Sequence, residues 1–467
     1  MNHMDASSTQ DAVRQLYEQS IAGGQLLHSI IVYQHGKELL RFAAAPYACT
    51  DKRELYSLSK SFTSTAVGVL FDQGLLNPED NVLSFFPMYA GLCAQDKRWQ
   101  RMLVRHLLSM STGHATCVFP QMAFADDSVQ AFFDAPLTYE PGEVFVYNSG
   151  ATCLLAAIVE RVAGVTVPVL LAQRVFPLLD IDDFTWKTCC DGKCQGGTGL
   201  SLSCDDLAKF GLMLLHQGVY NKRRVLSEEW VAMATSCQIS NSDNGTADWC
   251  SGYGFQFWRN SVGGFRGDGA FGQACIVLPQ RDMVVVLLSE CDDMCYEFNL
   301  VWPFLANIAE QPAMPAAPFA YLPTAGQPLE QVDTGWRTLE QNPVNLRALR
   351  LRAKPDGALL FLLTDTGVQR ISAPYGAWES NALVLKNLMP TLHHMIPRQT
   401  PQQLCFHAAA HQQSASWIIQ ARMYNAPHAF DFCLTLVDGL LSLTLRTKHD
   451  VFGAEKLLIE KRPNIAG

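Results

Sequence analysis

This chain of 467 residues carries the segment Leu55-Tyr56-Ser57-Leu58-Ser59-Lys60-Ser61-Phe62-Thr63. Apolar residues recur at helical spacing over residues 57–74, which predicts a helix ending near Gly74. Ser57 and Lys60 are three residues apart, so they share one face of that helix and the amine can reach the hydroxyl. A serine hydroxyl is a weak nucleophile near neutral pH and needs an adjacent base. The pair therefore predicts Ser57 as a nucleophile and Lys60 as its base.

Two physical effects favour this chemistry. Burial lowers the pKa of a lysine because it disfavours the charged form, and a neutral lysine can accept a proton. The amino end of a helix also carries positive dipole where negative charge would develop during the reaction. The alternative is a helix-capping serine followed by a solvated lysine. Ser57 and Lys60 form the only Ser-x-x-Lys pattern in the chain.

Further sequence blocks follow in a fixed order. They lie at residues 105–113, 141–150, 196–201 and 269–272. With these blocks, residues 20–310 resemble the class C β-lactamase-like superfamily, which includes penicillin-recognising enzymes, D-aminopeptidases, carboxypeptidases and esterases. The resemblance implies an α+β serine β-lactamase-like domain, in which helices flank an antiparallel sheet.

The resemblance also implies a set of site residues. Tyr147 would be the third catalytic residue, and the backbone N–H groups of Ser57 and Ala270 would form the oxyanion hole. A tyrosine near Lys60 could relay the serine proton to the leaving group, provided that neighbouring cations lower its pKa. The alternative for Tyr147 is a packed aromatic residue.

The tyrosine block departs from the family pattern. The family usually has Tyr-x-Asn, whereas this chain has Tyr147-Asn148-Ser149. A hydroxyl therefore stands where a carboxamide is expected. Asn148 and Ser149 are candidate substrate-binding residues.

The third motif departs further. The family triplet usually begins with Lys or His and ends with Gly, and the aligned residues here are Gly267, Asp268 and Gly269, all candidates for substrate binding. Side chains alternate faces along a strand, so Arg266 should not simply replace the missing cation. We therefore expect weak β-lactam hydrolysis and a preference for neutral esters or amides. A Gly267→Lys substitution is expected to shift the preference towards β-lactams.

Other polar residues have structural interpretations. His106 and His114 could be proposed as bases, but His106 at an apolar helix start is more typical of a structural histidine. Asp205 and Asp206 lie in the first turn of a predicted helix, where acids are expected because of the helix dipole.

The fifteen cysteines suggest reduced thiols, because the N-terminus has no basic and apolar stretch typical of a secretory signal. Cys189, Cys190 and Cys194 invite a metal hypothesis, but they lack the paired spacing of zinc sites. We expect loop thiols, no metal and no organic cofactor, in a cytoplasmic protein.

Composition narrows the choice of partners. The net charge of −9 argues against nucleic acid or an anionic membrane surface as the main partner. The longest apolar runs fall well short of the roughly 20 residues that span a bilayer. A small-molecule ester or amide is the expected partner, and the sequence does not indicate an oligomeric state.

Local patterns predict one sheet built from both ends of the first domain. A hairpin is expected over residues 27–43 and two strands over 271–278 and 283–289, with helices over 149–164 and 203–218 between them. Strands at both ends with helices between them are typical of an α+β domain.

We expect two domains in a chain of this length. Residues 10–310 would be the hydrolase domain, and the proline-rich residues 311–329 a linker. Residues 330–467 would be a β-rich accessory domain, since turn signals at 354–357 and 438–439 separate apolar runs.

The sequence therefore predicts a serine hydrolase that cleaves an ester or amide of a small molecule through an acyl-Ser57 intermediate. A β-lactamase or D-amino-acid peptidase is the enzymatic alternative. A non-catalytic penicillin-binding-like sensor is the other, and the intact set of Ser57, Lys60 and Tyr147 argues against it.

Overall fold

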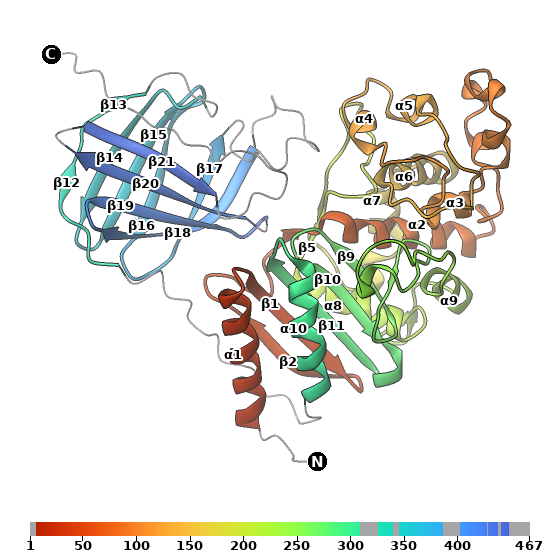
Figure 1. The fold of residues 1–467 in the computed structure, drawn as a ribbon, viewed down its shortest axis with the longest axis horizontal. Helices are drawn as coiled ribbons and strands as arrows, with labels where there is room; N and C mark the ends of the chain where they lie inside the picture. Colours follow the sequence, from red (N-terminus) through yellow and green to blue (C-terminus); the bar gives the residue numbers. More distant parts are fainter. Residues whose placement is uncertain are drawn as a thin grey trace. The chain divides into compact units, whose positions relative to one another are not determined.

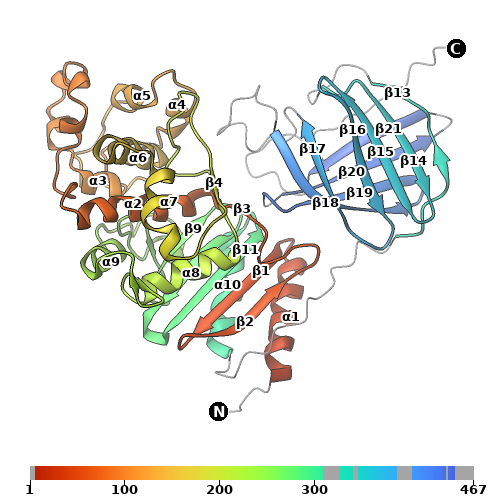
Figure 2. The ribbon, with the colours of Figure 1, turned by 180° about the vertical axis from the view of Figure 1, so that it is seen from behind.

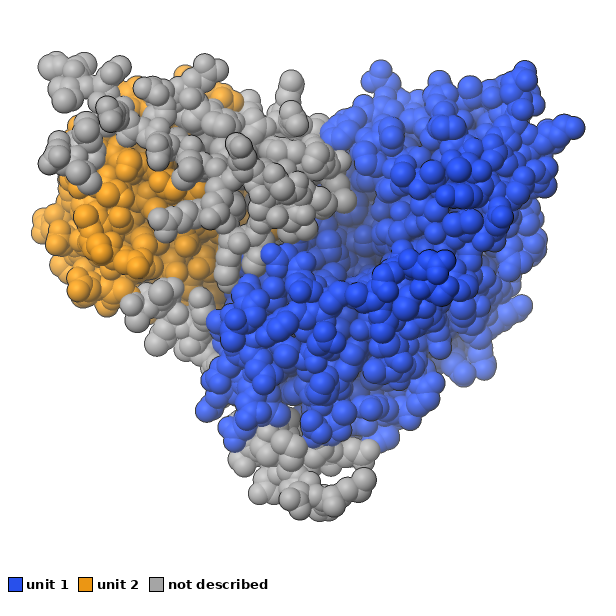
Figure 3. Space-filling model, viewed as in Figure 1, with its two compact units in different colours: residues 1–43, 49–317 blue, residues 44–48, 318–467 orange. Residues whose placement is uncertain are grey.

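The computed structural model describes residues 6–308, 326–339, 345–385, 402–426, 428–437 and 440–447. The chain divides into two compact units, which Figure 3 colours separately. Unit 1 comprises residues 1–43 and 49–317, and unit 2 comprises residues 44–48 and 318–467.

Unit 1 is built around a six-stranded antiparallel sheet in the order β2-β1-β11-β10-β9-β8. Its strands are β1 (Leu26–Gln34), β2 (Lys37–Ala43), β8 (Trp258–Arg259), β9 (Phe265–Gly269), β10 (Gln273–Leu278) and β11 (Met283–Glu290). Strand β1 pairs with β11, for example Ile30 opposite Leu287, so the two ends of the unit meet in one sheet as predicted. Every residue of β10 and β11 is buried, which explains their continuous apolar runs.

Helices cover both faces of this sheet. Helices α1 (Ala6–Ala22) and α10 (Met294–Asn307) lie on one face and α8 (Cys204–Leu215) on the other (Figures 1 and 2). Helix α8 begins where predicted, because the Ser203 side chain accepts a hydrogen bond from the backbone N–H of Asp206. Asp205 and Asp206 occupy its first turn, as expected.

A mostly helical layer completes unit 1. Its longest members are α2 (Ser59–Asp72) and α6 (Ser149–Ala163), which pack against each other. The other helices are α3 (Val104–Leu108), α4 (Phe119–Ala123), α5 (Ser128–Asp134), α7 (Val167–Arg174) and α9 (Glu228–Thr235). The 3-10 helices of the unit are η1 (Tyr56–Leu58), η2 (Val82–Phe85), η3 (Pro87–Tyr89), η4 (Leu92–Gln95), η5 (Lys97–Arg101), η6 (Phe176–Leu178), η7 (Ala247–Trp249) and η8 (Pro279–Arg281). Its short strands are β3 (Arg53–Glu54), β4 (Thr185–Trp186), β5 (Leu200–Leu202), β6 (Val219–Tyr220) and β7 (Arg223–Arg224).

The predicted helix over residues 57–74 begins differently from the expectation. Ser57 lies in the 3-10 turn η1, and the α-helix proper starts two residues later at Ser59. Tyr56 has a φ of 47°, which is outside the helical range and places the start of the α-helix after Ser57. The nucleophile candidate therefore lies on a tight turn between strand β3 and helix α2.

Unit 2 contains two antiparallel sheets of five strands each, in the described residues. The first has strands β12 (Val332–Asp333), β13 (Arg337–Thr338), β14 (Ala348–Lys354), β15 (Gly357–Thr364) and β16 (Gly367–Pro374). The second has β17 (Glu379–Leu385), β18 (Gln402–Gln413), β19 (Ser416–Met423), β20 (Ala429–Val437) and β21 (Leu440–Thr447). The turn predicted at 354–357 joins β14 to β15. The turn residues 438–439 and most of the predicted linker lie outside the described residues, although β20 and β21 pair as a hairpin.

No single helix among the described residues is both long and apolar enough to cross a bilayer. Residues 149–163 and 167–178 together satisfy the length and composition criteria, but they are bent by 61° at their break. Most of α6 is buried within unit 1.

Candidate active site

The turn that carries Ser57, η1 (Tyr56–Leu58), is fixed by hydrogen bonds on both sides of this residue. The Ser59 hydroxyl donates to the Tyr56 carbonyl oxygen at 2.6 Å and accepts from the Leu200 N–H at 3.1 Å. The Leu58 N–H donates to the Leu55 carbonyl oxygen at 3.1 Å. Ser57 is half-buried while its neighbours in the turn are buried. The turn therefore presents the Ser57 hydroxyl from a rigid support.

Lys60 lies within hydrogen-bonding distance of the nucleophile. Its Nζ is 3.0 Å from Oγ of Ser57, 3.0 Å from Oγ of Ser149 and 2.7 Å from the carbonyl oxygen of Gly197. Burial lowers the pKa of Lys60 to about 7, even though the nearby Asp268 acts in the opposite direction. A large fraction of Lys60 is therefore neutral near pH 7 and can accept a proton from Ser57.

Tyr147 precedes α6 and shares this site. The Ser57 side chain acts on the hydroxyl of Tyr147 and lowers its pKa, and Nζ of Lys60 lies 4.9 Å from the centroid of the Tyr147 ring. The ring stacks on Trp258 with centroids 5.3 Å apart and planes at 22°. Burial, followed by the charge of Asp268, raises the pKa of Tyr147. The charge of Arg266 lowers this pKa, but burial outweighs it, so the residue is a neutral phenol at physiological pH.

The two residues after Tyr147 have different roles. Ser149 faces Lys60 and stands where the family has a carboxamide. Asn148 caps α6, because its Oδ1 accepts from the N–H groups of Gly150 at 3.0 Å and Val118 at 3.1 Å. Its role in substrate binding stays a prediction. The oxygen of Asn148 thus holds the backbone of the neighbouring loop.

The third motif places a buried ion pair beside the site. Nε of Arg266 donates to Oδ2 of Asp268 at 2.9 Å, and Arg266 is fully buried. The same guanidinium donates to the Asp248 carbonyl oxygen at 2.8 Å and to Oδ1 of Asn260 at 3.1 Å. Its carbon lies 4.8 Å from the centroid of the Phe298 ring. Arg266 is thus committed to internal partners, in line with the expectation that it does not replace the missing cation.

Burial changes the protonation behaviour of Asp268. It raises the pKa of this carboxyl group, and the charges of Arg266 and Lys60 pull the pKa in the opposite direction. The side chains of Lys60 and Tyr147 in turn experience the charge of Asp268. A carboxyl group is therefore part of the electrostatic environment of the nucleophile.

Gly267 and Gly269 bring β9 close to the nucleophile turn. A Cβ atom at Gly267 would lie 2.6 Å from Oγ of Ser61, and one at Gly269 would overlap the carbonyl oxygen of Leu55. A side chain at Gly267 would therefore require the Ser61 hydroxyl to move, and the effect of Gly267→Lys stays a prediction. The close approach at Gly269 places the following residue, Ala270, next to the turn that carries Ser57.

The two histidines lie in separate hydrogen-bonded environments. Nδ1 of His106 accepts from the N–H of Leu103 at 3.1 Å, and Nδ1 of His114 is 2.9 Å from Oγ1 of Thr112. Burial lowers the pKa of each to about 4. Both are neutral near pH 7, and these contacts fit the structural interpretation.

The cysteine cluster contains a residue that spacing could not reveal. Cys189 and Cys194 are buried and Cys190 is exposed. Sγ of Cys153, on α6, lies 3.8 Å from Sγ of Cys189. Among the residues that the structure describes, no group of three or more His, Cys, Asp or Glu side chains could hold a metal ion.

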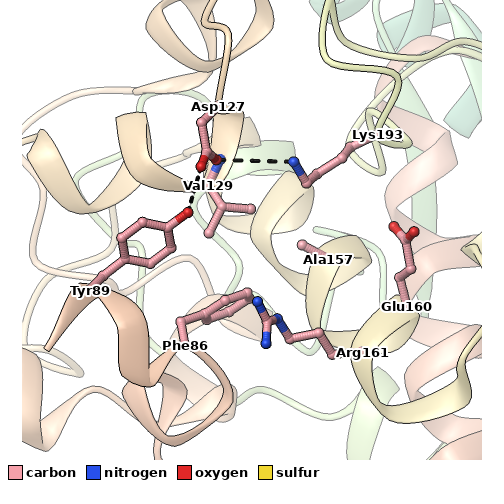
Figure 4. Close-up of a pocket in the computed structure, with 8 residues that line it drawn as sticks. All are labelled: Phe86, Tyr89, Asp127, Val129, Ala157, Glu160, Arg161 and Lys193. Atoms are coloured by element: carbon pink, nitrogen blue, oxygen red, sulfur yellow. Dashed lines mark hydrogen bonds and ion pairs between the residues drawn. The ribbon is translucent and has the colours of Figure 1, made fainter.

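A separate cavity of about 360 Å³ lies in the helical layer (Figure 4). Its lining residues are Phe86, Tyr89, Asp127, Val129, Ala157, Glu160, Arg161 and Lys193. The Tyr89 hydroxyl donates to Asp127 at 2.6 Å, and the Arg161 guanidinium lies over the Phe86 ring. Ser57, Lys60 and Tyr147 are not among the lining residues, so this cavity is distinct from the nucleophile site.

The comparison with known families agrees with this geometry. A family model described as Beta-lactamase matches residues 9–294, more than half of the chain. The chain belongs to the beta-lactamase family. The family membership confirms the resemblance seen in the sequence and the predicted fold class of the first domain.

Known members of the beta-lactamase family and related structures include several hydrolases. The 6-aminohexanoate-dimer hydrolase of Paenarthrobacter ureafaciens is 29% identical over 285 residues, which cover 57% of this chain and 73% of that protein. A family VIII carboxylesterase superposes with a TM-score of 0.51 at 17% identity, covering 63% of this chain and 97% of that one. The octameric penicillin-binding protein homologue of Pyrococcus abyssi covers 93% of this chain and 97% of its own, with a TM-score of 0.52 and 14% identity. This beta-lactamase family member is a serine hydrolase of the ester- or amide-cleaving type.

Three contributors to the site were not assigned a role from the sequence. They are Ser59, the Gly197 carbonyl and Trp258. Gly197 lies in the glycine-rich block at 196–201. The sequence identified this block but did not predict its contact with Lys60. Trp258 has no local motif, because its contact with Tyr147 joins residues more than a hundred positions apart.

Proposed function

We propose that this protein cleaves esters or amides of small molecules through an acyl intermediate on Ser57. The observation that carries the proposal is the position of Nζ of Lys60, 3.0 Å from Oγ of Ser57, in surroundings that lower its pKa to about 7. A buried, largely neutral amine at this distance is suited to act as a general base. The phenol of Tyr147 is a second proton-transfer group beside the Ser57 hydroxyl.

The reaction follows from these positions. Lys60 accepts the proton of Ser57 as Oγ forms a bond to the substrate carbonyl carbon. The N–H groups of Ser57 and Ala270 bind the oxyanion. As the intermediate collapses, the bond to the leaving group breaks, Tyr147 passes its proton to the leaving group, and Lys60 returns the Ser57 proton to Tyr147 and becomes neutral again. Water then hydrolyses the acyl-Ser57 ester, so that one ester or amide and one water give an acid and an alcohol or amine.

The substrate we propose is neutral near the scissile bond. Arg266 is buried and bound to Asp268, and Gly267 has no side chain that could supply a cation. A substrate carboxylate would meet the carboxyl group of Asp268 instead of a cation. The names of the related proteins, an amide hydrolase and a carboxylesterase, agree with linear amides or esters as substrates.

A substrate screen tests the proposed function. Short-chain p-nitrophenyl esters, D-amino-acid anilides and a chromogenic cephalosporin would be assayed beside the Ser57→Ala variant. We expect turnover of at least one ester or amide, and its loss in Ser57→Ala. Turnover that survives in Ser57→Ala would reject the assigned nucleophile. Absence of turnover and of any acyl-enzyme on all substrates would favour the non-catalytic sensor.

We also propose that residues 10–310 are the hydrolase domain, 311–329 a linker and 330–467 an accessory β domain. The division of the chain into two compact units supports this organisation, with unit 1 extending to residue 317. Limited proteolysis should cut first between residues 309 and 329. First cuts within residues 50–300 would argue against it. A small-molecule partner and a cytoplasmic location remain predictions.

A further inference from the structure

Two aromatic residues beside the proposed oxyanion hole have unusual backbone angles. Tyr56 has a φ of 47° and Phe271 a φ of 68°. Positive φ is unfavourable for residues other than glycine and persists only where the surrounding structure enforces it. Tyr56 immediately precedes Ser57, and Phe271 immediately follows Ala270. Each therefore adjoins one of the two proposed N–H donors.

The side chains of these two residues pack against each other. Their ring centroids are 5.0 Å apart and the ring planes meet at 66°, which is a favourable edge-to-face arrangement. Tyr56 is 2% exposed and Phe271 is 5% exposed. The contact ties the turn before α2 to the turn between β9 and β10, which are more than 200 residues apart in the sequence. Each ring thus helps to hold the strained backbone of the other turn.

Hydrogen bonds fix the peptide groups on both sides. The Ser59 hydroxyl donates to the Tyr56 carbonyl oxygen at 2.6 Å. That carbonyl belongs to the same peptide unit as the Ser57 N–H, so the bond also sets the direction of the N–H. On the other turn, Nε2 of the fully buried Gln273 donates to the Phe271 carbonyl oxygen at 2.7 Å and to that of Ser289 at 2.9 Å.

We infer that Tyr56 and Phe271 are positioning residues that set the spacing and direction of the two oxyanion donors, with Ser59 holding the first donor peptide. The inference rests on the proposed function, since it assigns residues to the oxyanion hole of that reaction. Gly269 lies between the two turns, where a side chain would overlap the carbonyl oxygen of Leu55. The donors are thus held by close backbone packing and by one aromatic contact.

The Phe271→Gly variant tests the inference. Glycine adopts positive φ without strain, so the backbone can keep its path while the ring contact is lost. Asp282→Gly is the matched control. Asp282, like Phe271, is a non-glycine residue with a positive φ (47°), but it lies in the turn between β10 and β11. The measurements are kcat and KM for a neutral p-nitrophenyl ester, the affinity for phenylboronic acid, and the thermal unfolding midpoint.

We expect Phe271→Gly to lower kcat and the boronate affinity by about 10- to 100-fold, less than the loss of a whole oxyanion donor. KM should change less than about threefold, because substrate binding does not require the aligned donors. Asp282→Gly should match the wild type in kcat, KM and boronate affinity. Unchanged kcat and boronate affinity in Phe271→Gly, with only a lower unfolding midpoint, would show a purely structural role and overturn the inference.

A second pair of variants keeps the test decisive if Phe271→Gly does not fold. Ser59→Ala removes the hydrogen bond to the Tyr56 carbonyl, whereas Ser59→Thr keeps a hydroxyl. We expect kcat to fall in Ser59→Ala and to recover in Ser59→Thr. Equal kcat in Ser59→Ala and wild type would overturn the role of Ser59. Failure of the proposed function would appear differently, as activity that survives in Ser57→Ala.

Discussion

Nζ of Lys60 donates a hydrogen bond of 2.7 Å to the carbonyl oxygen of Gly197, a residue 137 positions later in the chain. The amine is therefore held by three oxygens, from Ser57, Ser149 and Gly197. Such anchoring points the amine at the nucleophile and limits its access to water. It links the glycine-rich block at residues 196–201 directly to the proposed base.

Gly197→Ala should lower kcat at least about tenfold, because small displacements of a reacting group are costly. The new Cβ would lie 3.4 Å from Nζ of Lys60 and 3.0 Å from the carbonyl oxygen of Ser149. The matched control is Gly91→Ala, whose Cβ would have nothing within 4 Å. Steady-state kinetics on a neutral ester would measure the effect. Equal kcat in the two variants would show that the Gly197 contact does not position the base.

The pH dependence of kcat/KM should report the protonation state of Lys60. Burial lowers its pKa to about 7, and only the neutral amine can accept the Ser57 proton. The rate should therefore rise with pH up to about 7 and level off above it, and fall about tenfold per pH unit below it. Rates would be measured from about pH 5 to about pH 9. A flat profile across this range would contradict the role of Lys60 as base.

Tyr147→Phe should lower kcat at least about 10²-fold, the usual scale for a proton-transfer group. The variant keeps the ring that stacks on Trp258 and removes only the hydroxyl next to Ser57. Tyr89→Phe is the control, because it removes a hydroxyl that is bonded to Asp127 in the helical layer. A loss of less than about twofold in Tyr147→Phe would exclude the phenol from the mechanism.

The ratio of kcat/KM for a chromogenic cephalosporin to that for a neutral p-nitrophenyl ester should be well below one. A charge-assisted contact to a substrate carboxylate contributes roughly 1.5–3 kcal/mol, or about 10- to 150-fold in rate. Here the third motif has Asp268 and lacks the Lys or His of the family, and Arg266 is bound to Asp268. The Arg266→Met variant should not lower the ratio further. A ratio well above one would mean that a cation does reach the substrate.

Local sequence was sufficient to predict much of unit 1. The Ser57–Lys60 spacing, the sheet strands β1 and β11 and the helix end at Gly164 follow from short-range periodicity and capping. The family resemblance predicted that Tyr147 belongs to the same site as Ser57 and Lys60. Contacts that join distant segments could not be predicted this way, because no local pattern encodes them.

Asn148 has a structural role that the motif did not reveal. Its amide oxygen caps α6 and accepts a hydrogen bond from the N–H of Val118, a residue 30 positions earlier in the chain. The surroundings of Gly267 could not be predicted from its motif either. A Cβ atom there would contact Oγ of Ser61, a residue more than 200 positions earlier in the chain. In unit 2, the turn signals predicted a β-rich domain, but the division into two sheets depends on long-range pairing.

Ser57 is the proposed nucleophile, and Lys60 is proposed to activate it. A fluorophosphonate tests this proposal directly, because Oγ of an activated serine bonds to phosphorus and expels fluoride. Intact-mass measurement followed by peptide mapping would locate the adduct. We predict one adduct, on Ser57, that forms much more slowly in Lys60→Ala and is absent in Ser57→Ala. An adduct on another residue, or the same labelling in Ser57→Ala as in the wild type, would contradict it.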